Sequence, residues 1–79
     1  MALTRYKRTL RTGGTSDALD GIDGANLVDG DMAEVWQSDN VLRFYHLDAD
    51  SGASESDPAV IAPDTNPGTK RWILQTVTP

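Results

Sequence analysis

The absence of cysteine constrains this chain more than any other feature of its sequence. With 79 residues, no Cys and one His, it can form neither a disulfide nor a cysteine-ligated zinc site. A chain of this length buries only a small core, and five of its residues are aromatic. Domains of this size usually depend on a disulfide, a metal or a partner chain. The sequence therefore predicts one small domain whose main remaining support is a partner chain.

The charge of the chain is unevenly distributed. The net charge is −5, yet four of the seven cationic residues lie within the first eleven positions. A net acidic chain is repelled by polyphosphate, so nucleic acid is not an expected partner. No apolar run approaches the roughly 18 residues that span a membrane, so no membrane partner is expected either. The basic start predicts a strand guarded by charge or an arm that docks onto another protein.

Alternating apolar and polar residues predict strands in the second half of the chain. Residues 32–37 and 41–48 flank a short polar segment at 38–40, which is the pattern of a β-hairpin. The second of these stretches is rich in residue types that favour strands. A hairpin is therefore expected at the centre of the domain.

Prolines bound the next predicted strand. The short apolar stretch between Pro58 and Pro63 must lie at a sheet edge or end at these residues, because proline donates no ladder hydrogen bond. Pro63, Pro67 and Gly68 predict a rigid turn that leads into the last strand, residues 70–77. Prolines in this turn also restrict the unfolded chain, which stabilises a domain with a small core.

The first part of the chain lacks such periodicity. Residues 1–15 are expected to form an extended N-terminal arm, and residues 16–79 a small β domain. One short helical turn is predicted near 16–21, with Ser16 as its N-cap and Gly21 as its end. Together these elements predict an all-β fold, either a small antiparallel sandwich or a partly open barrel of about five short strands.

Three Asp-Gly pairs lie close together and raise the question of calcium. They are Asp20-Gly21, Asp23-Gly24 and Asp29-Gly30. Asp-Gly is the signal of a tight turn, and no starting position reproduces the EF-hand order of acids and glycine. No metal site and no cofactor are therefore predicted, and a calcium site of irregular geometry remains the alternative.

The sequence contains no recognisable catalytic constellation. A nucleophile triad would have to use His46, which lies inside a predicted strand. No G-x-S-x-G motif is present, and no spacing singles out a pair of carboxylates for glycoside hydrolysis. The chain is predicted not to be an enzyme, with no catalytic residues.

The large aromatic side chains allow two interpretations. Trp36, Phe44 and Trp72 are expected in the core, because a chain with few large apolar groups has few others to bury. Alternatively, Trp36, Tyr45 and Trp72 form a platform on which sugars stack. That alternative predicts a carbohydrate-binding module for receptor recognition.

Most of the chain resembles a known module. Residues 27–74 resemble a short β-rich module of the tail fibre and tailspike proteins of tailed phages and prophages. The matching pieces are a "DGD" turn at 29–31, a strand at 41–48, a small-residue loop at 51–56, "VIAPD" at 60–64 and "RWIL" at 71–74.

The resemblance implies a non-catalytic structural protein of the virion. Such a module attaches to or connects other virion proteins of a tail fibre, tailspike or baseplate, as a homo-oligomer for which a trimer is the expected state. Members of the family are usually long chains, so a capsid cement (decoration) protein that stabilises the phage head is the alternative. The residues expected to contact a partner are Arg5, Tyr6, Lys7, Arg8 and Arg11.

Overall fold

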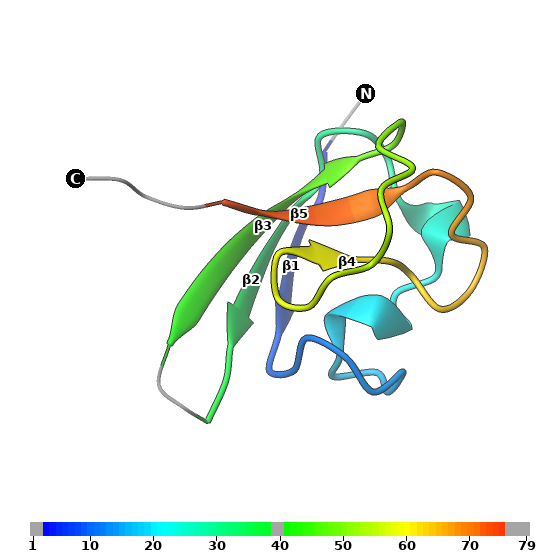
Figure 1. Cartoon of the computed structure of the whole chain (residues 1–79). Coiled ribbons are helices and arrows are strands. Elements are labelled where there is room, and N and C mark those ends of the chain that lie inside the picture. The colour runs from blue at the N-terminus through cyan, green and yellow to red at the C-terminus, as the bar shows by residue number, and fades with distance from the viewer. Residues whose placement is uncertain (1–2, 39–40, 76–79) are drawn as a thin grey trace.

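A computed structural model describes residues 3–38 and 41–75 of the chain. Five strands form one mixed sheet in the order β1-β2-β3-β5-β4 (Figure 1), which confirms a mainly β domain of about five short strands. Two short 3-10 helices lie between β1 and β2 along the chain. The elements are β1 (Arg5–Arg8), η1 (Leu19–Gly21), η2 (Gly24–Asn26), β2 (Met32–Trp36), β3 (Leu42–Asp48), β4 (Val60–Ile61) and β5 (Arg71–Gln75).

The predicted hairpin is present. Strands β2 and β3 pair antiparallel, from Met32 opposite His46 to Trp36 opposite Leu42, although residues 39–40 of the connecting turn lie outside the described residues. Strand β5 pairs antiparallel with the other side of β3. In Figure 1, β5 runs across the direction of β2 and β3, so the sheet is strongly curved.

The short strand between the prolines lies at a sheet edge, as predicted. Strand β4 contains two residues, and β5 is the one strand of the described chain with which it pairs. The turn that follows includes Pro67 and Gly68, where the Lys70 N–H donates to the Pro67 carbonyl at 2.8 Å. Gly68 has a φ of 49°, a left-handed conformation that glycine adopts without strain.

The N-terminal segment follows one of its two predictions, the charged strand, and not the other, the separate arm. Residues 5–8 are not a separate arm but strand β1, which pairs in parallel with β2. This pairing joins residues far apart in the sequence, so local periodicity gives no signal for it. The predicted helical turn is present as η1 and ends at Gly21, but its N-cap is Ala18 rather than Ser16.

The core lies between the concave side of the sheet and the segment that carries the two short helices. Tyr6 of β1 contacts Trp72 of β5 edge to face, with ring centroids 5.9 Å apart. Two strands separate β1 from β5 in the sheet, so this contact closes the curved sheet around the core. The buried core residues are Leu19, Ile22, Leu27, Ala33, Val35, Tyr45, Leu47, Ile61 and Trp72.

The prediction for the three large aromatic residues is confirmed for one and wrong for two. Trp72 is fully buried, whereas 54% of Trp36 and 39% of Phe44 is exposed. Successive residues of a strand point to opposite faces, so when Ala33 and Val35 of β2 fill the core, Trp36 must point outward. Phe44 points outward for the same reason, because its neighbour Tyr45 faces the core.

Candidate protein-interaction surface

The side of the sheet opposite the core carries several exposed apolar residues. Strands β2 and β3 place Met32, Trp36 and Phe44 there, all of them exposed. We call this side the outer face. By strand alternation and register its residues are Arg5, Lys7, Met32, Glu34, Trp36, Leu42, Phe44, His46, Val60, Ile73 and Gln75.

These apolar residues are contiguous. Trp36 lies directly opposite Leu42, and Phe44 lies opposite Glu34, one step along the same face. Cβ atoms of directly opposite residues are about 5 Å apart, and diagonal neighbours are within reach of aromatic side chains. Exposed apolar groups that adjoin one another in this way mark interaction sites more often than scattered single residues do.

A pocket of about 330 Å³ lies at one end of the outer face. Trp36 and Leu42 supply its apolar wall, and side chains of both charge signs surround the rest. Its lining residues are Lys7, Arg8, Thr9, Asp17, Glu34, Trp36 and Leu42. The pocket is therefore small and amphipathic, with room for one side chain or one sugar ring.

The predicted contact residues Arg5 and Lys7 lie at the rim of this face. The Arg5 guanidinium is 3.9 Å from the Glu34 carboxylate, and its side chain is 64% exposed. An ion pair of this kind contributes little to stability, because water and salt screen it. Both cations thus remain accessible to a partner.

Two other predicted contact residues support the core instead. The Tyr6 ring packs on Trp72, and the Arg8 guanidinium carbon lies 5.5 Å from the centre of that tyrosine ring. The Arg8 side chain also donates to the Lys7 carbonyl at 2.7 Å. Tyr6 and Arg8 are half-buried, so their principal contacts are within the domain.

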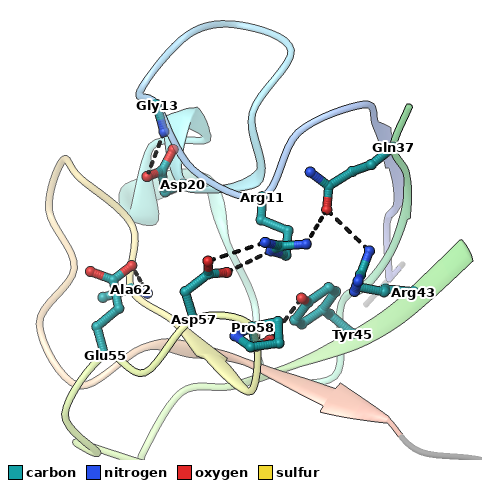
Figure 2. Close-up of polar contacts among 10 residues, drawn as sticks. All are labelled: Arg11, Gly13, Asp20, Gln37, Arg43, Tyr45, Glu55, Asp57, Pro58 and Ala62. Atoms are coloured by element: carbon teal, nitrogen blue, oxygen red, sulfur yellow. Dashed lines mark hydrogen bonds and ion pairs between the residues drawn. The ribbon is translucent and has the colours of Figure 1, made fainter. Parts of the chain in front are cut away.

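Arg11, the last predicted contact residue, links three segments of the domain (Figure 2). Its guanidinium binds both oxygens of Asp57, at 2.6 and 3.2 Å. A further nitrogen of the same group donates to the Gln37 side-chain oxygen, which also accepts from Arg43. Figure 2 shows the guanidinium between Asp57 and Gln37, so this side chain ties the loop after β1 to the loops beside β2 and β4.

Two buried carboxylates serve a purpose that the sequence did not indicate. Asp31 accepts hydrogen bonds from the Thr4 and Val28 amides, each at 2.9 Å. Asp20 accepts from the Gly13 and Gly14 amides, at 3.2 and 2.9 Å. Both side chains are almost inaccessible to solvent. By charge-assisted bonds, Asp20 holds the loop at 13–14 to η1, and Asp31 joins the chain before β1 to the turn before β2.

Asp23 caps η2 at the surface. Its carboxylate accepts from the Asn66 side chain and from the Ala25 amide, both at 2.9 Å. These two bonds, the first more than the second, hold the pKa of Asp23 below its usual value. Within residues 3–38 and 41–75, no group of three or more acidic or His side chains is arranged to hold a metal ion.

Tyr45 is the core residue with the clearest electrostatic perturbation. Its hydroxyl donates to the Pro58 carbonyl at 2.8 Å (Figure 2). Burial raises the pKa of Tyr45 above its usual value, because an apolar environment disfavours the charged phenolate. Tyr45 therefore faces the core and not the outer face, and it cannot form a stacking platform with Trp36.

His46 lies on the outer face, where its Nδ1 is hydrogen-bonded to the Gln75 side chain. No nucleophilic hydroxyl or carboxylate is bonded to its ring in the part of the chain that the structure describes. The geometry around His46 is that of a strand residue bonded to a diagonal neighbour on the adjacent strand.

The chain was compared with families and with individual proteins. No protein-family model, no curated protein and no solved structure matches it significantly. The resemblance to phage tail modules is thus supported by its residues alone and remains a prediction. Within the described residues, no helix has the length and apolar character needed to cross a membrane.

Proposed function

We propose that this domain is a non-catalytic assembly module of a bacteriophage virion, which attaches to or connects other virion proteins through its outer face. The observation that carries the proposal is the joint exposure of Met32, Trp36 and Phe44 on one side of the sheet. The virion context comes from the resemblance of residues 27–74 to tail fibre and tailspike modules. A tail or baseplate is the preferred location, and a capsid cement protein is the alternative.

The size of the apolar surface supports a role in association. Met32, Trp36 and Phe44 are between two-fifths and just over half exposed. Together they present roughly 300 Å² of apolar area, which at about 25 cal/mol per Å² corresponds to about 7 kcal/mol on complete burial. Part of this is lost to the entropy of association. Because that entropy cost is about 4–15 kcal/mol, further contacts of the outer face must add to these three residues in a stable complex.

The curvature of the sheet supports a partly open barrel over a sandwich. The contact between Tyr6 and Trp72 brings β1 toward β5 across the core. The outer face is then the convex wall of the barrel, available to identical copies. A homo-oligomer, with a trimer as the preferred state, buries this wall and leaves the opposite side with its two short helices exposed.

Association in solution tests the role of the outer face. We expect native protein to associate as its concentration rises, as followed by size-exclusion chromatography with light scattering. The double variant Trp36→Ser/Phe44→Ser should remain monomeric. Leu10→Ser is the matched control, because Leu10 is an exposed apolar residue outside the outer face. If native protein and the double variant have the same mass at every concentration, the outer face does not mediate self-association.

Particle association tests the virion assignment itself. Particles from the host that carries the gene should contain the chain after purification on a density gradient, at a constant ratio to the other structural proteins. The double variant should appear in the soluble fraction instead. Particles that lack native protein would refute the virion role.

A carbohydrate-binding module is the second candidate, because Trp36 is exposed beside the pocket. Its ring is accessible for sugar stacking, and Lys7, Asp17 and Glu34 supply polar groups at the pocket rim. This candidate predicts that a glycan shifts the emission of Trp36 and leaves that of the buried Trp72 unchanged. A glycan panel that changes neither emission would exclude it.

A further inference from the structure

The two edges of the sheet differ in how their backbone groups are satisfied. At the β4 edge, Val60 exchanges two hydrogen bonds with Ser56, both at 2.8 Å. The next outward-facing amide, that of Ala62, donates to the Glu55 carboxylate at 3.2 Å (Figure 2). This edge is therefore occupied by the chain's own loop.

The β1 edge is open over two residues. The Met32 amide donates to the Thr4 carbonyl at 3.0 Å, and β1 pairs in parallel with β2. In such a ladder alternate residues bond to the neighbouring strand, so the backbone groups of Arg5 and Lys7 face away from β2. Beyond the strand, the Thr9 and Leu10 amides are bonded to the Asp17 carbonyl, which limits the open edge to Arg5 and Lys7.

Most of the polar groups at this edge have no partner in the described chain. The Lys7 carbonyl accepts from the Arg8 side chain. The Arg5 amide, the Arg5 carbonyl and the Lys7 amide therefore face away from β2 without a partner in the described chain. Their spacing is that of the groups to which a further β-strand would hydrogen-bond. Both residues are exposed, so no loop among residues 3–38 and 41–75 covers this edge against an incoming segment.

The charge of β1 selects the kind of strand that fits. Its sequence is "RYKR", three cations in four residues. A second copy of β1 would bring cations opposite cations, which destabilises a strand pair. An acidic strand would instead place carboxylates beside Arg5 and Lys7, the two cations of β1 on the outer face.

We propose that β1 binds an extended acidic segment of another protein, which adds to the sheet as a sixth strand. The inference rests on the proposed role in assembly, and it assigns the chemistry of the partner. Backbone hydrogen bonds supply the register in this binding mode, and side chains supply the specificity. The outer face then continues onto the added strand.

A defined peptide tests the proposal with the full chain. The probe is a blocked nonapeptide in which Glu alternates with Thr or Val, and the control peptide has Lys in place of Glu. In an NMR titration we expect the acidic peptide to shift the Arg5 and Lys7 amides and to slow their hydrogen exchange. The Lys peptide should leave both unchanged. Equal binding of the two peptides, or no shift at millimolar concentration, would overturn the proposal.

Two substitutions at one position separate charge from backbone pairing. Lys7→Ala removes the charge but keeps the backbone amide, and it should lower the affinity for the acidic peptide about 3-fold. Lys7→Pro also removes the outward amide, which an edge position tolerates, and should weaken binding by about 10-fold or more. If Lys7→Pro binds within twofold of Lys7→Ala, the backbone does not pair and the proposal is wrong.

Two further measurements keep the test independent of folding and of the outer face. In the free native chain the Arg5 and Lys7 amides should exchange much faster than that of Tyr6, which faces β2. Equal protection of the three amides would mean that the edge is already occupied. Trp36→Ser should bind the acidic peptide normally. Loss of peptide binding in that variant would show that the peptide occupies the outer face and not the strand edge.

Discussion

Replacing Asp31 by asparagine tests whether buried carboxylates hold this domain together. Its carboxylate is 1% exposed, and its two oxygens accept from the Thr4 and Val28 amides. It thus joins the chain before β1 to the turn before β2. Asparagine has the same shape but only one acceptor oxygen. One of the two amides would therefore face a second donor at a position that is almost closed to solvent.

The magnitude follows from these contacts. A hydrogen bond to a charged group contributes about 1.5–3 kcal/mol, and a buried amide without a partner costs about 1–3 kcal/mol. Asp31→Asn should therefore lower the free energy of unfolding by about 3 kcal/mol. A domain of 79 residues is stable by about 4–12 kcal/mol. The loss is then a large fraction of the total, and the variant should still fold.

Urea denaturation measures this loss. With a slope of about 1 kcal/mol per molar, the midpoint should fall by about 3 M. Asp29→Asn is the matched control, because this exposed residue of the same turn accepts one bond, from the Ala49 amide at 2.9 Å. It should cost less than about 1 kcal/mol. Equal midpoints for the two variants would refute the idea that Asp31 is a structural link.

Two further changes test other polar links. Arg11→Lys should lower the free energy of unfolding by about 1 kcal/mol, because lysine cannot bind both Asp57 oxygens. The control Arg5→Lys should have no measurable effect, because its ion pair is exposed. Equal urea midpoints for the two variants would show that Arg11 is not a structural link. The Asn66 side chain lowers the pKa of Asp23 below 3.8. The stability that the domain gains from this hydrogen bond is therefore present above this pH, and it is lost as the pH falls through the folded-state pKa of Asp23. Asn66→Gly suits the φ of 50° at this position. Its free energy of unfolding should be lower than that of native protein at neutral pH and equal to it in acid. A difference in free energy of unfolding that is constant with pH would show that the Asp23 carboxylate does not contribute.

Local chemistry made part of this fold predictable. The β2–β3 hairpin follows from alternating residues on either side of a polar turn, and both signals lie within 17 residues of one another. The edge position of β4 follows from Pro58 and Pro63, because a residue without an amide hydrogen cannot join a central ladder. These inferences needed no knowledge of what packs above the sheet.

The identity of the buried face was not predictable from residue size. Alternation divides β2 into Ala33 and Val35 on one face and Met32, Glu34 and Trp36 on the other. Size favours the second set for the core, and the structure buries the first. Glu34 was the available signal, since a carboxylate at the centre of a strand face argues against burial of that face.

The outer face, and the buried carboxylates that stabilise the domain behind it, depend on contacts between segments that are distant in the sequence. A basic segment such as residues 5–8 has the same composition whether it is an arm or a strand, and only its pairing with β2 distinguishes the two. Asp20 and Asp31 were interpreted as turn residues, and both occur next to glycine as turns require. Their burial depends on backbone amides that only the folded chain brings to them.

The sequence predicts that a partner chain supports the fold, and the structure also contains polar links within the domain. Buried carboxylates and Arg11 link the segments between the strands to one another, so the domain gains cohesion without using the apolar groups of its outer face. Trp36 and Phe44 contribute little to the core and are available for association. At a protein concentration low enough for native protein to be monomeric, the double variant Trp36→Ser/Phe44→Ser should then unfold at nearly the same urea concentration as native protein, with a change below about 1 kcal/mol, as is usual for exposed positions. If this monomeric variant is instead largely unfolded, association supplies the stability and the polar links do not suffice.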